Sequence, residues 1–299
     1  MTERLSFDDQ ISWNKWKSLF LIVIIFAFFV VLGYVISIAV DPGYFFVIMI
    51  ISIIFSISYI LISYYNSDKI ALASVNAKPA SSSQHRMLFN AVENMSLASG
   101  LPMPRVYVME SPEINAFASG RDPQHAVICV TTGALEKLNK QELEGVIAHE
   151  MSHIANYDIR FMTLAAVMIG MISIISQIFL RNLWFSSGNS KENRNIIFLI
   201  IAIVLAIVAP IAVQLVSLAI SRKREFAADA TGVKFTRYPP GLGSALQKIK
   251  KESISPQETK RFSKATAPLF ISDPFKKKFQ NLFSTHPDID KRIEILRRM

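Results

Sequence analysis

Val146-Ile147-Ala148-His149-Glu150-Met151-Ser152-His153-Ile154-Ala155 lies near the middle of this 299-residue chain. His149 and His153 are four residues apart, about one helical turn, so both imidazoles can reach the same metal ion. Glu150 then lies close enough to act on a water held by the metal without being a ligand itself. The stretch therefore predicts a metal-dependent hydrolase.

The residues around this H-E-x-x-H pattern favour a helix. Apolar residues recur at helical spacing from Leu143 to Ala155, after the polar residues 140–145. Alternatively, His149 and His153 are ordinary polar residues on a partly buried helix, because the pattern arises by chance in roughly one per cent of chains of this length. That alternative leaves the acidic pair described below unexplained.

The composition indicates a membrane protein. Hydrophobic residues make up 51% of the chain, and the formal net charge is +9. The Lys and Arg residues cluster where apolar runs end and no nucleic-acid-binding module is recognisable, so we expect no nucleic-acid partner. The single cysteine, Cys129, lies in an apolar strand-like stretch and is expected to be buried and unpaired.

Two uncharged runs, residues 18–40 and 44–65, are each long enough to span a bilayer. The turn sequence Asp41-Pro42-Gly43 between them predicts a tight helical hairpin. A cleaved signal peptide is the competing interpretation, but the first run is longer than a signal-peptide core and lacks a small-residue cleavage site.

Basic residues flank this hairpin at both ends. Arg4, Lys15 and Lys17 precede it, and Lys69 and Lys78 follow it. The positive-inside rule therefore predicts that both ends lie in the cytoplasm, in a multi-pass protein of the cell (inner) membrane.

Residues 161–180 and 195–221 form a third and a fourth uncharged run, joined by a polar linker. We expect four spans, although a shallow hairpin is the alternative because Arg181, Lys191 and Arg194 would lie outside. The expected division is a cytoplasmic tail (1–17), a membrane hairpin (18–65), the first part of a cytoplasmic catalytic domain (66–160), a second hydrophobic hairpin (161–221) and the second part of that domain (222–299).

The soluble part before the H-E-x-x-H stretch predicts a helix and a small antiparallel sheet. The helix begins near residues 81–83 and ends near Gly100, and a strand covers residues 105–109. Residues 115–119 and 125–131 predict a hairpin. Its first strand could bind an extended peptide by β-augmentation, although residues 115–118 could equally be a loop or an ordinary edge strand.

Glu225 and Asp229, which follow the fourth run, are again one helical turn apart. No third histidine follows His153 at the metzincin spacing, because Ile159 occupies that position. A carboxylate can complete a catalytic zinc site with two histidines, and we choose Glu225. Asp229 would then accept a hydrogen bond from a ligand histidine. The alternative is a solvated acidic pair.

The C-terminal part is predicted to be soluble and helical. Pro239-Pro240-Gly241 is expected to break the chain before an amphipathic helix over residues 242–251. Residues 284–288 are expected to cap a final helix that contains Arg292. Lone histidines such as His286 are more often structural or exposed than catalytic.

In this order, the parts resemble the HtpX family of bacterial membrane-bound zinc metallopeptidases, relatives of the membrane proteases that process prenylated C-terminal motifs. The resemblance covers the whole chain. It comprises the N-terminal hairpin, Asn115-Ala116-Phe117-Ala118, His149-Glu150-Met151-Ser152-His153, a hydrophobic pair, Glu225-x-x-x-Asp229, and His286-Pro287 followed by Arg292.

The resemblance implies a mostly helical α+β fold with a gluzincin-like catalytic domain and one zinc ion. It implies proteolysis of the cytoplasmic parts of misfolded or damaged membrane proteins, overlapping with an ATP-dependent membrane protease. It also implies that Asn115 contacts the substrate strand, that His286 stabilises the oxyanion, and that Arg292 pairs with a carboxylate.

The expected chemistry is zinc-promoted peptide hydrolysis with Glu150 as the general base. A non-catalytic membrane scaffold is one alternative, but a structural zinc site has no use for Glu150. A prenyl-protein protease is another, but four spans are too few to enclose the large chamber expected of one.

Overall fold

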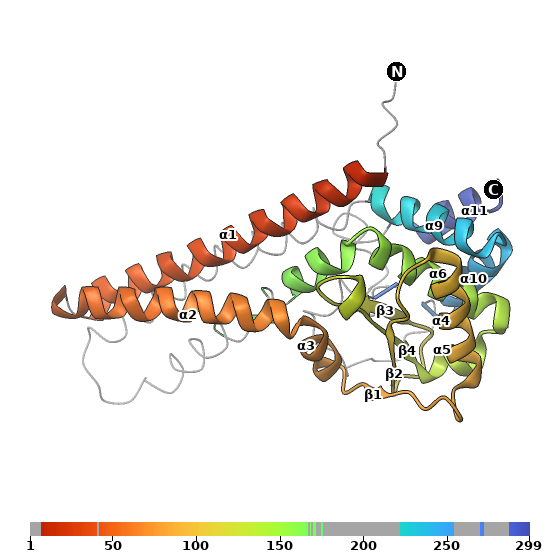
Figure 1. The fold of residues 1–299 in the computed structure, drawn as a ribbon, viewed down its shortest axis with the longest axis horizontal. Helices are drawn as coiled ribbons and strands as arrows, with labels where there is room; N and C mark the ends of the chain where they lie inside the picture. The colour runs from red at the N-terminus through yellow and green to blue at the C-terminus, as the bar shows by residue number, and fades with distance from the viewer. Residues whose placement is uncertain are drawn as a thin grey trace, which may run out of the picture.

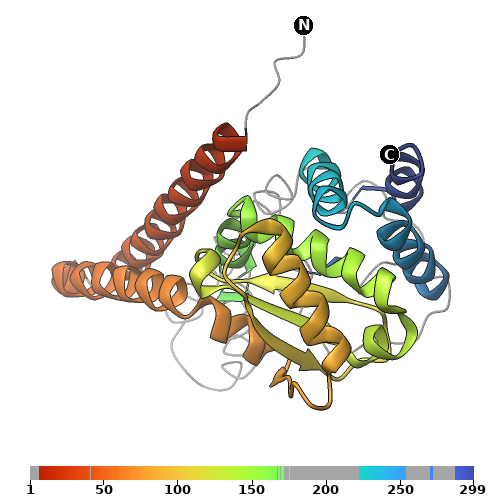
Figure 2. The same cartoon turned by 45° about the vertical axis from the view of Figure 1, so that its right-hand side comes forward.

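The fold is mostly helical with one small sheet, as the sequence predicts (Figures 1 and 2). The structure is a computed structural model, and it describes residues 7–40, 42–166, 168, 170, 171, 175, 222–253, 270, 271 and 287–299.

Helices α1 (Phe7–Val40) and α2 (Phe45–Tyr65) form the predicted N-terminal hairpin, joined through the short η1 (Pro42–Tyr44). They lie side by side and extend away from the sheet and the helices around it (Figure 1). Residues 12–37 and 45–65 are long and apolar enough to span a membrane, and only 6% of the apolar window of α2 is buried. An uncovered apolar surface of this size needs a lipid environment, so the protein is a membrane protein.

The structure tests the first two predicted spans but not the third and fourth. Residues 158–166 are helical and pack against α1, because Phe161, Leu164 and Ala165 share a buried cluster with Leu21 and Ile25. Most of residues 167–180, and all of residues 195–221, lie outside the described residues. The count of four spans stays a prediction.

The sheet is mixed, and the prediction of an antiparallel sheet is wrong. Its order is β1 (Lys78–Pro79), β2 (Arg105–Met109), β4 (Val127–Thr131) and β3 (Ala116–Ser119). The predicted β3–β4 hairpin is antiparallel, but β2 and β4 are parallel. The reason is that the chain reverses once into β3 and again into β4, which then lies between β2 and β3.

Both faces of the sheet are covered. In β4, Ile128 and Val130 face the main core, which α4 (Arg86–Ser99) and α6 (Lys140–Ala155) cover. Val127 and Cys129 face the other core, beside α3 (Ser67–Ser74) and residues 158–166. Burial on both faces explains why β4 is an uninterrupted apolar run. Cys129 is buried, as predicted.

Helix α6 is the central helix of the soluble part. Asn139 begins it with a capping box, in which its side chain accepts from Glu142 N–H and Glu142 accepts from Asn139 N–H. The helix packs against α4, α9 (Arg222–Thr236) and α10 (Pro239–Ser253). All its residues from Leu143 to Ala155 are buried except Glu144.

The remaining elements are η2 (Pro123–His125), α5 (Thr132–Lys137) and α11 (Ile289–Leu296). Pro239 and Pro240 occupy the first turn of α10, so they begin that helix and do not break the chain before it. Proline is tolerated there because the first N–H groups of a helix have no partner within it. Asp288 caps α11, as predicted.

Candidate active site

Two helices bring the buried side chains of His149, His153 and Glu225 together. His149 and His153 lie on α6, and Glu225 lies in the first turn of α9. The Nε2 atoms of the two histidines are 3.3 Å apart, and each lies 3.6–3.7 Å from a carboxylate oxygen of Glu225. The structure therefore places the three predicted ligands around one point.

A glycine allows α9 to approach α6 this closely. A Cβ atom at Gly232 would lie 3.1 Å from the backbone nitrogen of His149 and 3.2 Å from the carbonyl carbon of Ala148. These are tight contacts with backbone atoms, which cannot swing away as a side chain does. Gly232 thus sets how near Glu225 lies to the histidines.

Asp229 and Arg292 lie behind His149. The Nδ1 atom of His149 is 2.9 Å from Asp229 Oδ1. Arg292, on α11, donates from Nε and Nη2 to the two oxygens of Asp229 at 2.8 and 2.7 Å. Its Nη1 is 3.4 Å from Glu225 Oε2. The predicted pairing of Asp229 with a ligand histidine, and of Arg292 with a carboxylate, is thus present in the geometry.

Asp158 lies behind His153 and was missed by the sequence reasoning. Its Oδ2 is 3.1 Å from His153 Nδ1, and its Oδ1 is 3.2 Å from Arg224 Nε. The signal was an acidic residue just past the helix that carries His153. Each histidine therefore has its own buried carboxylate.

The pKa values of the two histidines are shifted in opposite directions. Burial lowers the pKa of His149, helped by the charge of Arg292 and only partly opposed by Asp229. Burial also acts to lower the pKa of His153, but the hydrogen bond to Asp158 and the charge of Glu225 outweigh it and raise that pKa to about 9. Arg292 holds the pKa of Asp229 below its usual range in spite of burial.

The donor set fits a zinc ion. Each Nδ1 faces a carboxylate and so carries a proton, which makes Nε2 the atom of each ring that can bind a metal, and both Nε2 atoms face Glu225. Ligand atoms arranged tetrahedrally at zinc distances are roughly 3.3–3.6 Å apart, close to the separations seen here. One cation would satisfy all three groups, and all three are buried.

Glu150 lies beside this point and against β3. It is 2% exposed, and the backbone N–H of Ala118 donates to its carboxylate. Burial raises the pKa of Glu150 to about 7, although the charge of His153 opposes that rise. A carboxyl group with a pKa near neutrality can accept and release a proton at physiological pH.

The predicted substrate strand lies next to Glu150 but is covered in this structure. Asn115 and all of β3 are buried. Asn115 O pairs with β4 through Thr131 N–H, and Ala116 O accepts from Ile271 N–H at 3.0 Å. Phe270 packs edge-on against Phe117, with ring centres 5.5 Å apart. Residues 270 and 271 thus occupy part of the edge of β3.

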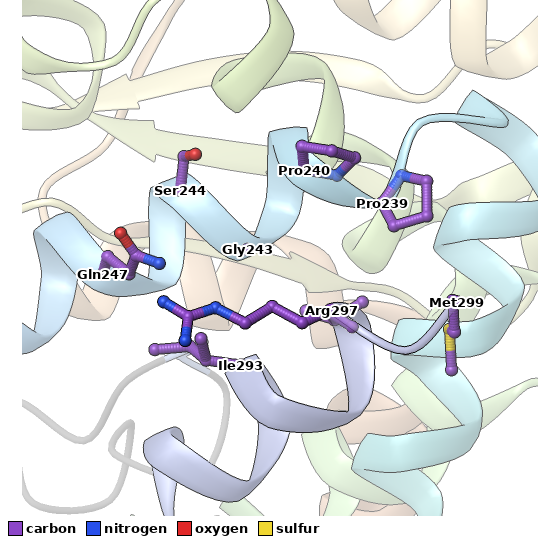
Figure 3. Close-up of a pocket in the computed structure, with 9 residues that line it drawn as sticks. Pro239, Pro240, Gly243, Ser244, Gln247, Ile293, Arg297 and Met299 are labelled. Atoms are coloured by element: carbon purple, nitrogen blue, oxygen red, sulfur yellow. The ribbon is translucent and has the colours of Figure 1, made fainter.

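One predicted site residue is not tested, and one groove lies apart from this cluster. His286 lies outside the described residues. A groove of about 440 Å³ lies between α10 and α11, where Arg297 extends towards Gln247 (Figure 3). None of the candidate site residues lines that groove.

Comparison with known proteins agrees with this geometry. The profile of peptidase family M48 matches residues 82–299. A protease HtpX homolog from Caldanaerobacter subterraneus subsp. tengcongensis is 49% identical over 251 residues, covering 82% of this chain and 83% of the relative. A protease HtpX homolog from Dictyoglomus thermophilum is 42% identical, covering 98% and 95% of the two chains.

Among solved structures, the crystal structure of S. mikatae Ste24p gives a TM-score of 0.48 at 18% sequence identity. The match covers 96% of this chain and 66% of that chain.

Proposed function

Because this chain belongs to peptidase family M48 and is a metallopeptidase of the HtpX group, we propose that it is a membrane-bound zinc endopeptidase with Glu150 as its general base. The observation that carries the proposal is the convergence of His149, His153 and Glu225 on one buried point, with the Glu150 carboxylate beside it.

In this proposal, His149, His153 and Glu225 hold a single zinc ion. Asp229 orients His149 and Asp158 orients His153, because each carboxylate accepts the Nδ1 proton and keeps Nε2 available. Arg292 neutralises Asp229 and lies near Glu225, so the buried site does not carry an excess of negative charge.

Zinc, when bound, supplies a Lewis acid that makes water more acidic and polarises a carbonyl group. Glu150 takes the proton from the attacking water and passes it to the leaving amine. Its burial keeps its pKa near 7, which suits both steps. His286 is proposed to stabilise the oxyanion, on the strength of the family resemblance alone.

We propose that an extended substrate pairs with β3 along residues 115–118, next to Glu150. Support comes from the hydrogen bond between Ala118 N–H and Glu150, which aligns the strand with the base. The Ala116 carbonyl accepts from Ile271 N–H in this structure, so a substrate that binds there must displace Ile271.

The proposed substrates are unfolded or damaged membrane proteins, cut on the cytoplasmic side of the cell membrane. The support is the family resemblance, the charge pattern around the hairpin, and the attachment of α1 to the chain beside the site. Functional overlap with an ATP-dependent membrane protease rests on the resemblance alone.

The test uses the full chain, purified in detergent and incubated with an unfolded membrane protein and, separately, with the same substrate folded. We expect cleavage of the unfolded substrate that a chelator abolishes and added zinc restores. Undiminished cleavage by the fully metal-stripped protein would contradict the proposal.

A further inference from the structure

Asn14 is a buried amide on the first membrane helix, α1, and it contacts the chain beside the metal ligands. Its side chain is 5% exposed. Its Nδ2 donates to Asp158 Oδ1 and to the backbone carbonyl of Asn156, both at 2.8 Å. Both amide hydrogens are thereby used on a segment 142–144 residues away in the chain.

These two acceptors lie at the end of the zinc-binding helix. Asn156 is the residue that ends α6, and Asp158 is the carboxylate that contacts His153 Nδ1 at 3.1 Å. Asn14 thus binds one oxygen of Asp158 while His153 binds the other. Asp158 is fully buried, so its orientation depends on these protein contacts and on Arg224.

One neighbouring residue of α1 bonds within the helix, and another contacts the segment that follows α6. Ser18, also fully buried, donates from Oγ to Asn14 O at 2.9 Å, a bond within α1. The ammonium group of Lys15 lies 4.8 Å from the ring centre of Tyr157. Tyr157 has a φ of 58°, a left-handed conformation that a tyrosine rarely adopts.

We infer that Asn14 is a positioning residue for the metal site: by holding Asp158 and the end of α6, it sets the orientation of the His153 ring. The inference rests on the proposed function, since it concerns the same site. Nothing in the sequence marks Asn14, which lies among residues that start a membrane helix. If Asn14 has this role, the packing of α1 against the end of α6 is part of the metal site.

The experiment measures zinc affinity by chelator competition in the full-length protein in detergent, for the parent and for Asn14→Ala. We expect Asn14→Ala to weaken zinc binding about tenfold, the low end of the effect of losing a group that orients a ligand. Cobalt substituted for zinc should show a changed visible absorption spectrum, because the His153 ring is no longer held.

Ser18→Ala is the matched control. It removes a fully buried polar group one turn along α1, but leaves both side-chain bonds of Asn14 in place. We expect zinc affinity and the cobalt spectrum to stay within twofold of the parent. An equal loss in Ser18→Ala and Asn14→Ala would mean that any damage to this helix end suffices, and would overturn the inference.

A second variant covers the case in which Asn14→Ala fails to fold. Asn14→Asp keeps the shape of the side chain but places two carboxylates together, so it should bind zinc more weakly than the parent. Zinc affinity equal to that of the parent in folded Asn14→Asp would overturn the inference.

Different results would overturn the role of Asn14 and the proposed function. A parent protein that binds no zinc overturns both. A parent that binds zinc and cleaves substrate, with an Asn14→Ala variant unchanged in affinity and cobalt spectrum, overturns only the role of Asn14.

Discussion

Each of the two histidines that face Glu225 has a carboxylate behind it, and the two carboxylates have different partners. Asp229 is paired with Arg292 from α11, whereas Asp158 is paired with Arg224 from α9 and Asn14 from α1. Groups that orient a ligand contribute less to metal affinity than the ligand itself. The two kinds of residue can therefore be separated by mutation.

Replacing Asp229 by Asn should weaken zinc retention or activity by roughly 10–100-fold, because the amide is a poorer acceptor for the Nδ1 proton of His149. Glu225→Ala should lose zinc more completely, since it removes a ligand. Metal analysis of both variants after the same dialysis decides the matter. A metal-free Asp229→Asn beside a fully loaded Glu225→Ala would show that their roles are reversed.

Zinc affinity should depend on pH through His153. Its pKa in the folded protein is about 9, above the ordinary value of 6.5, so the metal-free site holds a proton at neutral pH that zinc must displace. Apparent affinity should therefore fall about tenfold for each pH unit below about 9.

Chelator competition between pH 7 and 9 measures this dependence. Asp158→Asn is the control, because loss of the charge beside His153 lowers its pKa and should flatten the dependence over this range. A parent affinity that does not change between pH 7 and 9 would contradict the assignment of that proton to His153.

Helical spacing was sufficient to predict that His149 and His153 share one helix face and that Glu225 and Asp229 share another. It was insufficient for Asp158 and Asn14. Asp158 follows Tyr157, where the chain turns in a left-handed conformation that the residue type does not suggest. Asn14 depends on a contact 144 residues away, which no local pattern encodes.

At the level of helices and strands, the site depends on how closely α6 and α9 pack. The sequence predicted α6 well, because its apolar spacing is a local signal. It could not predict that β2 and β4 are parallel, because strand order is set by long-range packing. It also gave no sign that Ile271 pairs with Ala116.

Gly232→Val tests the packing of α6 against α9. The new side chain would meet the backbone of Ala148 and His149, so α9 must move away and carry Glu225 with it. Overpacking costs about 1–3 kcal/mol, and we expect at least tenfold weaker zinc binding although no ligand is removed.

Gly243→Ala in α10 is the matched control, because the nearest atom to its added Cβ is Leu296 Cβ at 4.0 Å. It should keep the zinc affinity of the parent. If Gly232→Val binds zinc as tightly as the parent and Gly243→Ala do, the approach of α9 does not set the position of Glu225.

At the scale of the whole molecule, two contacts among the described residues connect the N-terminal hairpin with the metal site. Residues 158–166 continue from α6 and pack against α1, and Asn14 of α1 contacts Asp158. We expect that replacing residues 161–221 by a soluble linker destroys zinc binding, even though every ligand remains. Zinc content and cleavage of membrane substrates by that variant measure this; normal values for both would show that the segment is only an anchor.

The account as a whole depends on one buried site that binds zinc and uses Glu150 as its base. The most direct measurement compares zinc content and peptide cleavage in the parent and in Glu150→Gln. The amide keeps the shape of Glu150 but cannot take up the proton. We predict about one zinc per chain in both proteins and a 10²–10⁴-fold lower turnover in the variant. A Glu150→Gln protein that retains zinc and cleaves at the parent rate would contradict the account.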